Sequence, residues 1–159
     1  MRRKDREITD INAVFAIIER CKTIHLAMVD DGKPYAVTMN FGYRREGDAL
    51  ILYLHSACEG RKTDILRKNP TVFFQMDCNG EPIAGTAGNP CSYGWRYESV
   101  TGSGTAVFLE DDDEKTDALN RLLGHVAETA ETFSFPPAAL AKTCVFRIRS
   151  VDMIGKQCK

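Results

Sequence analysis

The pattern of apolar and polar residues predicts a helix near the start of the chain and a strand hairpin after it. Apolar residues at the spacing of one helix face follow Thr9, which can cap a helix: Ile11, Val14, Phe15 and Ile18. We expect this helix to end near Cys21 and to lay its apolar face on a sheet. Residues 23–29 then predict a strand, and the Asp-Gly pair within residues 30–33 predicts a hairpin turn.

The strand that returns from this turn, residues 34–41, has two different faces. One face carries the larger side chains: Tyr35, Val37, Met39 and Phe41. The other face carries small or polar ones: Ala36, Thr38 and Asn40. We expect this second face to be sheltered. A sheltered polar surface needs hydrogen-bonding partners, and a bound ligand with polar edges is one way to supply them.

The middle of the chain predicts a strand followed directly by a short helix. Residues 49–54 form an apolar run, and they predict a strand that ends at His55. A helix is expected from Gly60 to the Asn69-Pro70 pair, because the residue before a proline avoids helical angles. The segment between the strand and the helix holds a histidine and a bend of small residues.

The tripeptide Gly60-Arg61-Lys62 at the start of this helix is a candidate phosphate site. Helix N-termini leave backbone N–H groups unpaired and carry a partial positive charge. Gly60 has no side chain, so the backbone there can approach a ligand closely. Arg61 adds a planar guanidinium and Lys62 a compact ammonium, and both groups bind phosphate well. The same residues also fit an ordinary strand-to-helix turn with two solvated basic side chains.

The second half of the chain adds further strands and one longer helix. Residues 71–77 predict a strand, residues 78–90 a loop rich in glycine and proline, and residues 93–109 a long strand or a bent pair. Acidic residues 110–114 open a helix, and we interpret them as a solvated N-terminus rather than a metal site. Residues 145–154 predict a closing strand.

The order of these elements favours a mainly β fold with flanking helices. Most strands follow one another through turns, and the helices are too few for a doubly wound parallel sheet. An antiparallel barrel with helices packed on its outside fits this order. A length of 159 residues is that of about one domain, so we expect a single domain over residues 1–159.

Composition narrows the class of protein. The formal net charge of −1 gives no basic excess for nucleic-acid binding, and no apolar run is long enough to span a membrane. The six cysteines include no C-x-x-C pair, which argues against a zinc site and a small disulfide scaffold. Reduced thiols are typical of the cytoplasm. We therefore expect a cytoplasmic protein without a metal, nucleic-acid or membrane partner.

Three segments carry a resemblance to a known family: residues 34–43, 53–70 and 97–104. In this order they resemble the FMN-binding split-barrel superfamily, which includes the pyridoxamine 5′-phosphate oxidases. They are more similar still to its branch of nitroimidazole-resistance (Nim) related proteins. The resemblance covers nearly the whole chain. It implies an antiparallel split β-barrel and a homodimer with two FMN molecules between the subunits.

The resemblance also implies the residues of a cofactor site. Three would hold the FMN phosphate: Gly60, Arg61 and Lys62. Four would line the flavin ring by backbone and side chain: Val37, Thr38, Met39 and Asn40. Tyr53 and His55 would flank the ring and the phosphate chain, and Ser99 would approach from the partner subunit. His55 matches the position of the active-site histidine in the Nim branch.

Two positions depart from the pattern of that branch. It usually has proline where this chain has Thr38, and arginine where this chain has Glu98. Glu98 places a negative charge where a positive one is expected, which bears on the substrate rather than on the flavin. We find no match to the C-terminal arginine-histidine segment with which pyridoxamine phosphate oxidases bind their substrate.

The resulting hypothesis is an FMN-dependent oxidoreductase that reduces a small planar acceptor such as a nitro compound. The flavin would perform the hydride chemistry, with His55 as the catalytic residue. His55 also fits a structural role at a strand end, and we interpret His25 and His125 as structural. Two other classes stay open on the same fold: a flavin-binding sensor or store without turnover, and a haem-binding protein with a histidine ligand.

Overall fold

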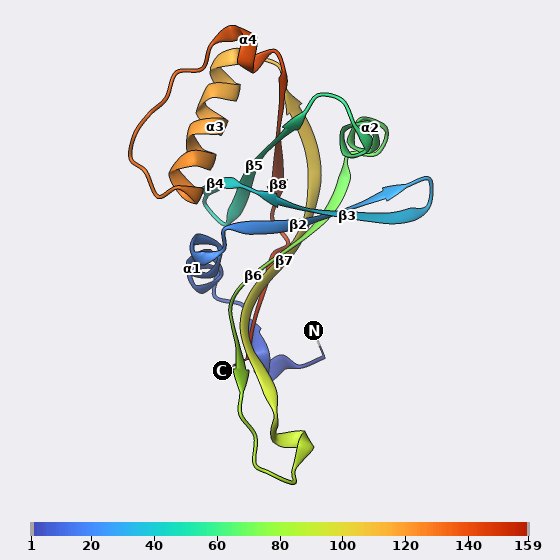
Figure 1. Ribbon diagram of the computed structural model, residues 1–159, viewed down its shortest axis with the longest axis vertical. Coiled ribbons are helices and arrows are strands. Elements are labelled where there is room, and N and C mark those ends of the chain that lie inside the picture. The colour runs from blue at the N-terminus through green and yellow to red at the C-terminus, as the bar shows by residue number, and fades with distance from the viewer. Residues whose placement is uncertain (1, 159) are drawn as a thin grey trace.

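The computed structural model describes residues 2–158 and shows a nine-stranded sheet with helices packed against it (Figure 1). The helices are α1 (Ile11–Arg20), α2 (Arg61–Lys68), α3 (Asp112–Val126) and α4 (Pro137–Leu140), with 3₁₀ turns at Lys4–Arg6 and Pro90–Ser92. The strands are β1 (Glu7–Ile8), β2 (Thr23–Asp30), β3 (Lys33–Asn40), β4 (Gly42–Glu46), β5 (Ala49–Ala57), β6 (Thr71–Ile83), β7 (Gly94–Leu109), β8 (Thr143–Ser150) and β9 (Ile154–Cys158). Within residues 2–158 no helix has the length and apolar character needed to cross a membrane.

The strand order is β3-β2-β6-β7-β8-β5-β4, and β9 pairs with β7 and β1 beside this path. Every pair is antiparallel. Strands β3 and β4 are the two ends of the path, so the sheet stays open between them. The predicted class, a mainly β antiparallel split barrel with flanking helices, is therefore confirmed.

Strand β5 is buried on both faces, which explains its continuous apolar run. Leu52 faces the main core, which α1 covers with Ile17 and Ile18. Ile51 and Tyr53 face a second, smaller cluster, to which α3 and α4 also contribute. The sheet thus packs against helices on two sides, and β5 lies between the two clusters.

Helix α1 has a different cap from the one predicted. Asp10 is the N-cap, and its carboxylate accepts a hydrogen bond from the Asn12 N–H at 3.1 Å. Thr9 is displaced from that role because the neighbouring carboxylate both caps the helix and interacts favourably with its dipole. The helix ends at Arg20 with Cys21 as the C-cap, as predicted.

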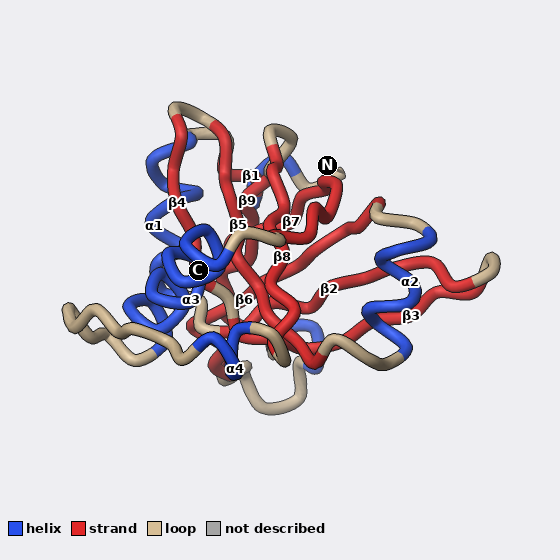
Figure 2. The backbone as a smooth tube through the Cα atoms, turned by 90° about the horizontal axis from the view of Figure 1, so that it is seen from above, coloured by secondary structure: helices blue, strands red, loops and turns tan. Residues whose placement is uncertain are grey.

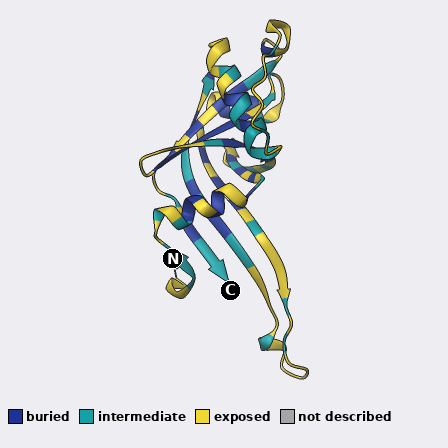
Figure 3. Cartoon of the chain, turned by 90° about the vertical axis from the view of Figure 1, so that its left-hand side faces the viewer, coloured by how far each residue is buried: buried dark blue, intermediate teal, exposed yellow. Residues whose placement is uncertain are grey.

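The segment predicted as a loop, residues 78–90, is partly strand. Strand β6 continues to Ile83 and pairs with β7 as far as Gly94, across a register shift between Cys78 and Glu81. The paired strands form an arm that projects from the body of the molecule, and its far end is exposed (Figure 3). Pairing between segments distant in sequence overrides the local glycine and proline signal here.

The predicted closing strand, residues 145–154, is divided into β8 and β9. The Asp152 carboxylate accepts hydrogen bonds from the Ser103 hydroxyl at 2.6 Å and the Ser103 N–H at 3.1 Å. This contact interrupts the ladder, so β8 pairs with residues 105–109 of β7 while β9 pairs with residues 97–101.

One face of the sheet is open in the single chain. Ala36, Thr38 and Asn40 are exposed, so the expectation that this side of β3 is sheltered is not met within the protomer. The face continues across β2 and β6, because His25 pairs in register with both Thr38 and Gln75. Helix α2 lies at one side of this region, beside the β2–β3 hairpin (Figure 2).

Candidate functional site

The turn between β5 and α2 is held in place by Thr63. This side chain is buried, and its hydroxyl donates to the Ala57 carbonyl at 3.1 Å. The Ser56 hydroxyl donates to the same carbonyl at 2.9 Å. Gly60 has φ 131° and ψ 164°, and no side chain caps the helix there. Since residues with a side chain rarely adopt that conformation, glycine is required for its backbone freedom, and the first N–H groups of α2 stay uncapped.

Arg61, the first residue of α2, is oriented by the end of the β2–β3 hairpin. Its Nε donates to Asp30 Oδ2 at 2.9 Å, and its guanidinium carbon lies 4.4 Å from the Tyr35 ring centroid. The side chain is still 57% exposed. An anion at the helix N-terminus would therefore meet a guanidinium whose plane is already fixed by two contacts.

Asp30 and Tyr35 were not among the predicted site residues. Their contact with Arg61 depends on how the hairpin lies against α2, and a local sequence pattern carries no signal for it. Asp30 and Tyr35 nevertheless determine the orientation of the Arg61 guanidinium.

Lys62 brings a second positive charge to the same place. Its Nζ lies 3.5 Å from Met39 Sδ, and partial burial lowers the pKa of Lys62. Within residues 2–158 no carboxylate forms an ion pair with it. A partly desolvated cation without a counterion is costly, so this position favours a bound anion.

His55 lies next to Lys62. Desolvation of the imidazole, and then repulsion by the Lys62 charge, lower the pKa of His55. Strand β5 continues past His55 to Ala57, so the histidine stands within the strand rather than at its end as predicted. In the single chain it is exposed. The neutral imidazole is the favoured form, and it can both donate and accept a hydrogen bond.

The four residues predicted to line a ring lie together on β3 and divide between its two faces. Val37 and Met39 turn inward, and Met39 is only 8% exposed. Thr38 and Asn40 stand on the open face. Because β3 is an end strand of the sheet, backbone groups along its outer side are available to a ligand.

Two predicted residues lie apart from this group. Tyr53 is buried in the second cluster, with the Arg121 guanidinium 5.9 Å from its ring centroid. Ser99 lies on β7 between Asp77 and Lys156 in register, and it lines a separate hollow of about 430 Å³. One chain therefore brings together the turn at Gly60 before α2, His55 and β3, but not Tyr53 or Ser99.

The amino-acid sequence matches a known family over most of its length. The match to the pyridoxamine 5′-phosphate oxidase family spans residues 10–157. The chain belongs to this family. No curated protein sequence matches it. The predicted resemblance is thus confirmed at the level of the family.

Solved structures place this pyridoxamine 5′-phosphate oxidase family member more narrowly. It is similar to a candidate 5-nitroimidazole antibiotic resistance protein from Bacteroides thetaiotaomicron, with 32% identity over 95% of this chain and 86% of that chain, and a TM-score of 0.81. The resemblance to the Nim branch is therefore confirmed.

Two further structures share the fold at lower identity. An FAD and haem binding protein from Mycobacterium smegmatis has 21% identity over 97% of this chain and 74% of that chain, with a TM-score of 0.80. A flavocytochrome from Azotobacter vinelandii has 21% identity over 100% of this chain and 72% of that chain, with a TM-score of 0.78.

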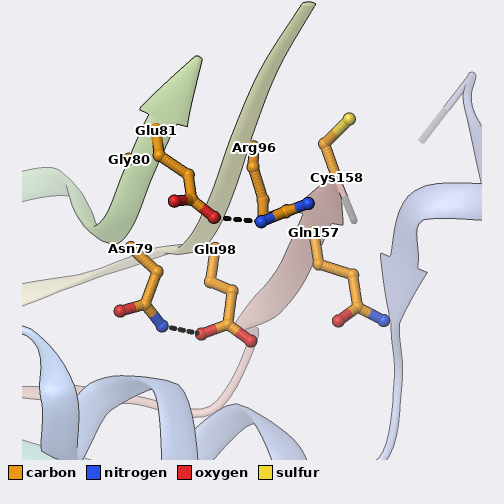
Figure 4. Close-up of a pocket in the computed structure, with 7 residues that line it drawn as sticks. All are labelled: Asn79, Gly80, Glu81, Arg96, Glu98, Gln157 and Cys158. Atoms are coloured by element: carbon orange, nitrogen blue, oxygen red, sulfur yellow. Dashed lines mark hydrogen bonds and ion pairs between the residues drawn. The ribbon is translucent and has the colours of Figure 1, made fainter. Parts of the chain in front are cut away.

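Glu98, which stands where the Nim branch has arginine, lies on the side of the sheet that faces α1. It forms an ion pair with Arg20 at 2.6 Å and accepts a hydrogen bond from the Asn79 amide at 2.7 Å. Together with Glu81 and Arg96, which pair with each other, it lines a cavity of about 420 Å³ at the base of the arm (Figure 4). The negative charge of Glu98 is thus matched inside the chain, and none of Gly60, Arg61 and Lys62 lines this cavity.

The residues around α2 and β3 fit a ring ligand that ends in a phosphate. Arg61, Lys62 and the uncapped N-terminus of α2 supply positive charge and N–H donors. The outer edge of β3, with Thr38 and Asn40, supplies hydrogen-bonding groups for a planar ring. In the described part of the chain, no group of three His, Cys, Asp or Glu side chains is placed to hold a metal ion.

Proposed function

We propose that the chain binds FMN between two identical subunits and is an FMN-dependent oxidoreductase that reduces a small planar acceptor, such as a nitro compound. Membership of the pyridoxamine 5′-phosphate oxidase family supports a flavin ligand. The neighbours from Mycobacterium and Azotobacter, described as an FAD and haem binding protein and a flavocytochrome, support it further. The similarity to a candidate nitroimidazole-resistance protein supports a nitro acceptor.

The observation that carries the proposal is the partly buried, uncompensated Lys62 beside an uncapped helix N-terminus. A terminal phosphate would neutralise this charge and satisfy the free N–H groups at once. Arg61, held by Asp30 and Tyr35, adds its remaining guanidinium donors. FMN ends in such a phosphate, and riboflavin has none, which is why we propose FMN as the cofactor.

The second subunit completes the site in this proposal. The face with Ala36, Thr38 and Asn40 is open in one chain, and a flat ring lying on it would stay half exposed. Ser99 is 8% exposed and lines a separate hollow, and in this proposal it contacts the ring bound to the partner subunit. Two-fold homodimers are the commonest oligomers and provide this covering wall by symmetry.

His55 is the proposed catalytic residue. When bound, FMN supplies the hydride chemistry. The neutral imidazole of His55, kept so by desolvation and by Lys62, is suited to orienting the acceptor through a hydrogen bond. The influence of the Lys62 charge on His55 supports this role, because Lys62 is one of the residues proposed to bind the phosphate.

Two measurements on purified protein test the proposal. The absorption spectrum separates a flavin from a haem, since a haem gives a Soret band. Stopped-flow reoxidation of the reduced, FMN-loaded protein by nitro and quinone acceptors then separates an oxidoreductase from a flavin store. We expect His55→Ala to keep the fold and most FMN affinity, and to reoxidise about a hundredfold or more slowly. A reduced protein that no acceptor reoxidises would instead be a sensor or store.

A further inference from the structure

A continuous row of polar side chains crosses the open face of the sheet. In register it runs from Thr38 on β3 to His25 on β2, then to Gln75 on β6 and Thr101 on β7. Thr38 belongs to the ring-lining group, whereas no role on this face was predicted for His25. The row therefore extends the proposed flavin site to residues on three further strands.

Both ring nitrogens of His25 have partners in this row. Nδ1 lies 3.1 Å from Thr38 Oγ1, and Nε2 lies 3.6 Å from Asp77 Oδ1. A hydroxyl, an imidazole and a carboxylate thus follow one another across β3, β2 and β6. The side chains of His25 and Asp77 are 49% and 53% exposed in the single chain, so they are open to a ligand or a partner.

The carboxylate decides how the imidazole is oriented. We assign the single N–H of neutral His25 to Nε2, because Nε2 is the ring nitrogen that faces the Asp77 carboxylate, and this assignment leaves Nδ1 as an acceptor. The Thr38 hydroxyl then donates its hydrogen to Nδ1, and only its oxygen lone pairs remain for a ligand. When His25 is protonated, Nδ1–H donates to the Thr38 oxygen, and the hydroxyl hydrogen becomes free to donate to a ligand.

We propose that Asp77, His25 and Thr38 form a relay, in which the Asp77 carboxylate lies beside His25 and His25 is hydrogen-bonded to Thr38, and that this relay sets the direction in which Thr38 donates toward the bound flavin ring. His25 is then a positioning residue of this site, acting through Thr38. This inference rests on the proposed function, because it takes the flavin as the ring that lies on β3. The polar edge of oxidised flavin carries mainly carbonyl and ring-nitrogen acceptors, so a donating Thr38 binds it more tightly.

The charges that face His25 come from few groups. On β6 the contacting charge is that of Asp77. The neighbours on β3 and β2 are uncharged: Thr38, Asn40, Thr23 and Ala27. Beyond Asp77, the next charged residue across the sheet is Lys156 on β9. Lys156 pairs with Ser99 on β7, and Ser99 pairs with Asp77 on β6. An affinity change caused by His25 should therefore respond to Asp77 first.

Riboflavin affinity measured against pH tests the relay. Riboflavin is the suitable probe, because the FMN phosphate itself titrates near pH 6 and would obscure the effect. The experiment uses a His55→Gln background, which removes the other histidine near the ring. We expect riboflavin to bind about three- to tenfold more tightly when His25 is protonated, at low pH, than when it is neutral, at high pH. His25→Gln and Thr38→Val should each abolish the step, while Thr71→Val, an exposed threonine on the same sheet, should retain it.

The Asp77→Asn variant tests the other end of the relay. Without the carboxylate, a hydrogen on Nε2 of neutral His25 is no longer favoured, so the difference in riboflavin affinity between low and high pH should become smaller. A step that persists in His25→Gln, a step of opposite direction, or a step of unchanged size in Asp77→Asn would overturn the relay.

Nitrogen NMR of the ligand-free chain separates this inference from the proposed function. Neutral His25 should carry its hydrogen on Nε2, and a hydrogen found on Nδ1 would overturn the relay even if flavin binds. Absence of any flavin binding would instead overturn the proposed function and the ring assignment of Thr38, whatever the tautomer.

Discussion

The ammonium of Lys62 lies 3.5 Å from the thioether sulfur of Met39, and this contact joins the start of α2 to the edge strand β3. Because Met39 offers no negative charge, the lysine is held near the sheet without being neutralised. The contact brings the candidate phosphate site and the candidate ring site into one place. Because a partly desolvated charge is costly, we expect Lys62 to lower the stability of the ligand-free chain.

Replacing Lys62 should therefore raise the stability of the ligand-free chain and lower its affinity for FMN. Lys62→Met removes a partly desolvated cation whose pKa is lowered by burial, so we expect the ligand-free chain to melt a few degrees higher, about 2–4 °C for each 1 kcal/mol gained. FMN affinity should fall about ten- to a hundredfold. Calorimetry and fluorescence titration measure the two effects. Lys68→Met, at the exposed far end of α2, is the matched control and should change neither. An unchanged FMN affinity in Lys62→Met would contradict the assignment.

Gly60 and Gly124 should respond to alanine in opposite directions. Gly60 has φ 131° and ψ 164°, a conformation nearly restricted to glycine, so Gly60→Ala should cost about 1–3 kcal/mol of unfolding free energy. Gly124 lies within α3, where an added Cβ would be 3.5 Å from its nearest neighbour, the Thr129 carbonyl oxygen. Gly124→Ala should stabilise by about 0.5–1 kcal/mol. Urea unfolding compares the two, and a neutral Gly60→Ala would show that the turn relaxes freely.

The protonation of His55 should report the phosphate. The Lys62 charge is one cause of the lowered pKa of His55, so a phosphate beside Lys62 should weaken that repulsion. We expect a higher pKa of His55 in the FMN complex than in the riboflavin complex, which shares the ring but lacks the phosphate. In the ligand-free chain, Lys62→Met should likewise raise the pKa of His55. Proton NMR titration measures each value, and equal values in the two complexes would place the phosphate elsewhere.

The open sheet face should be the subunit interface. Phe73 is 50% exposed on this face. It pairs in register with Ala27, and Ala27 pairs with Ala36, so the phenyl ring of Phe73 lies beside two small side chains. Phe73→Glu should place a charge in this interface and yield monomers with weakened FMN binding. Sedimentation velocity at micromolar concentration measures the change. Val151→Glu, at a 68% exposed position outside the strands, is the control. A wild-type monomer with FMN bound would contradict the dimer.

The sequence predicted those parts of the fold that depend on local patterns. The helix after Gly60 follows from a glycine start and a proline stop, and β5 follows from its apolar run. The division of β8 from β9 did not follow, because it depends on Asp152 contacting Ser103, about fifty positions earlier in the chain.

The candidate site shows the same limit. Gly60, Arg61 and Lys62 are recognisable because they are adjacent in sequence. The contacts that orient them are not, since Asp30 reaches Arg61 only after the β2–β3 hairpin packs beside α2. Relations of this kind are fixed by strand register and helix placement, which a single sequence does not display.

The central claim is that Arg61 and Lys62 hold a terminal phosphate, and the most direct test compares FMN with riboflavin in wild type and Arg61→Ala. Titration of both ligands, followed by flavin fluorescence, gives four dissociation constants under one set of conditions. We expect wild type to prefer FMN, and Arg61→Ala to lose about ten- to a hundredfold in FMN affinity while riboflavin affinity barely changes. Equal losses for FMN and riboflavin, or no preference in wild type, would contradict the account.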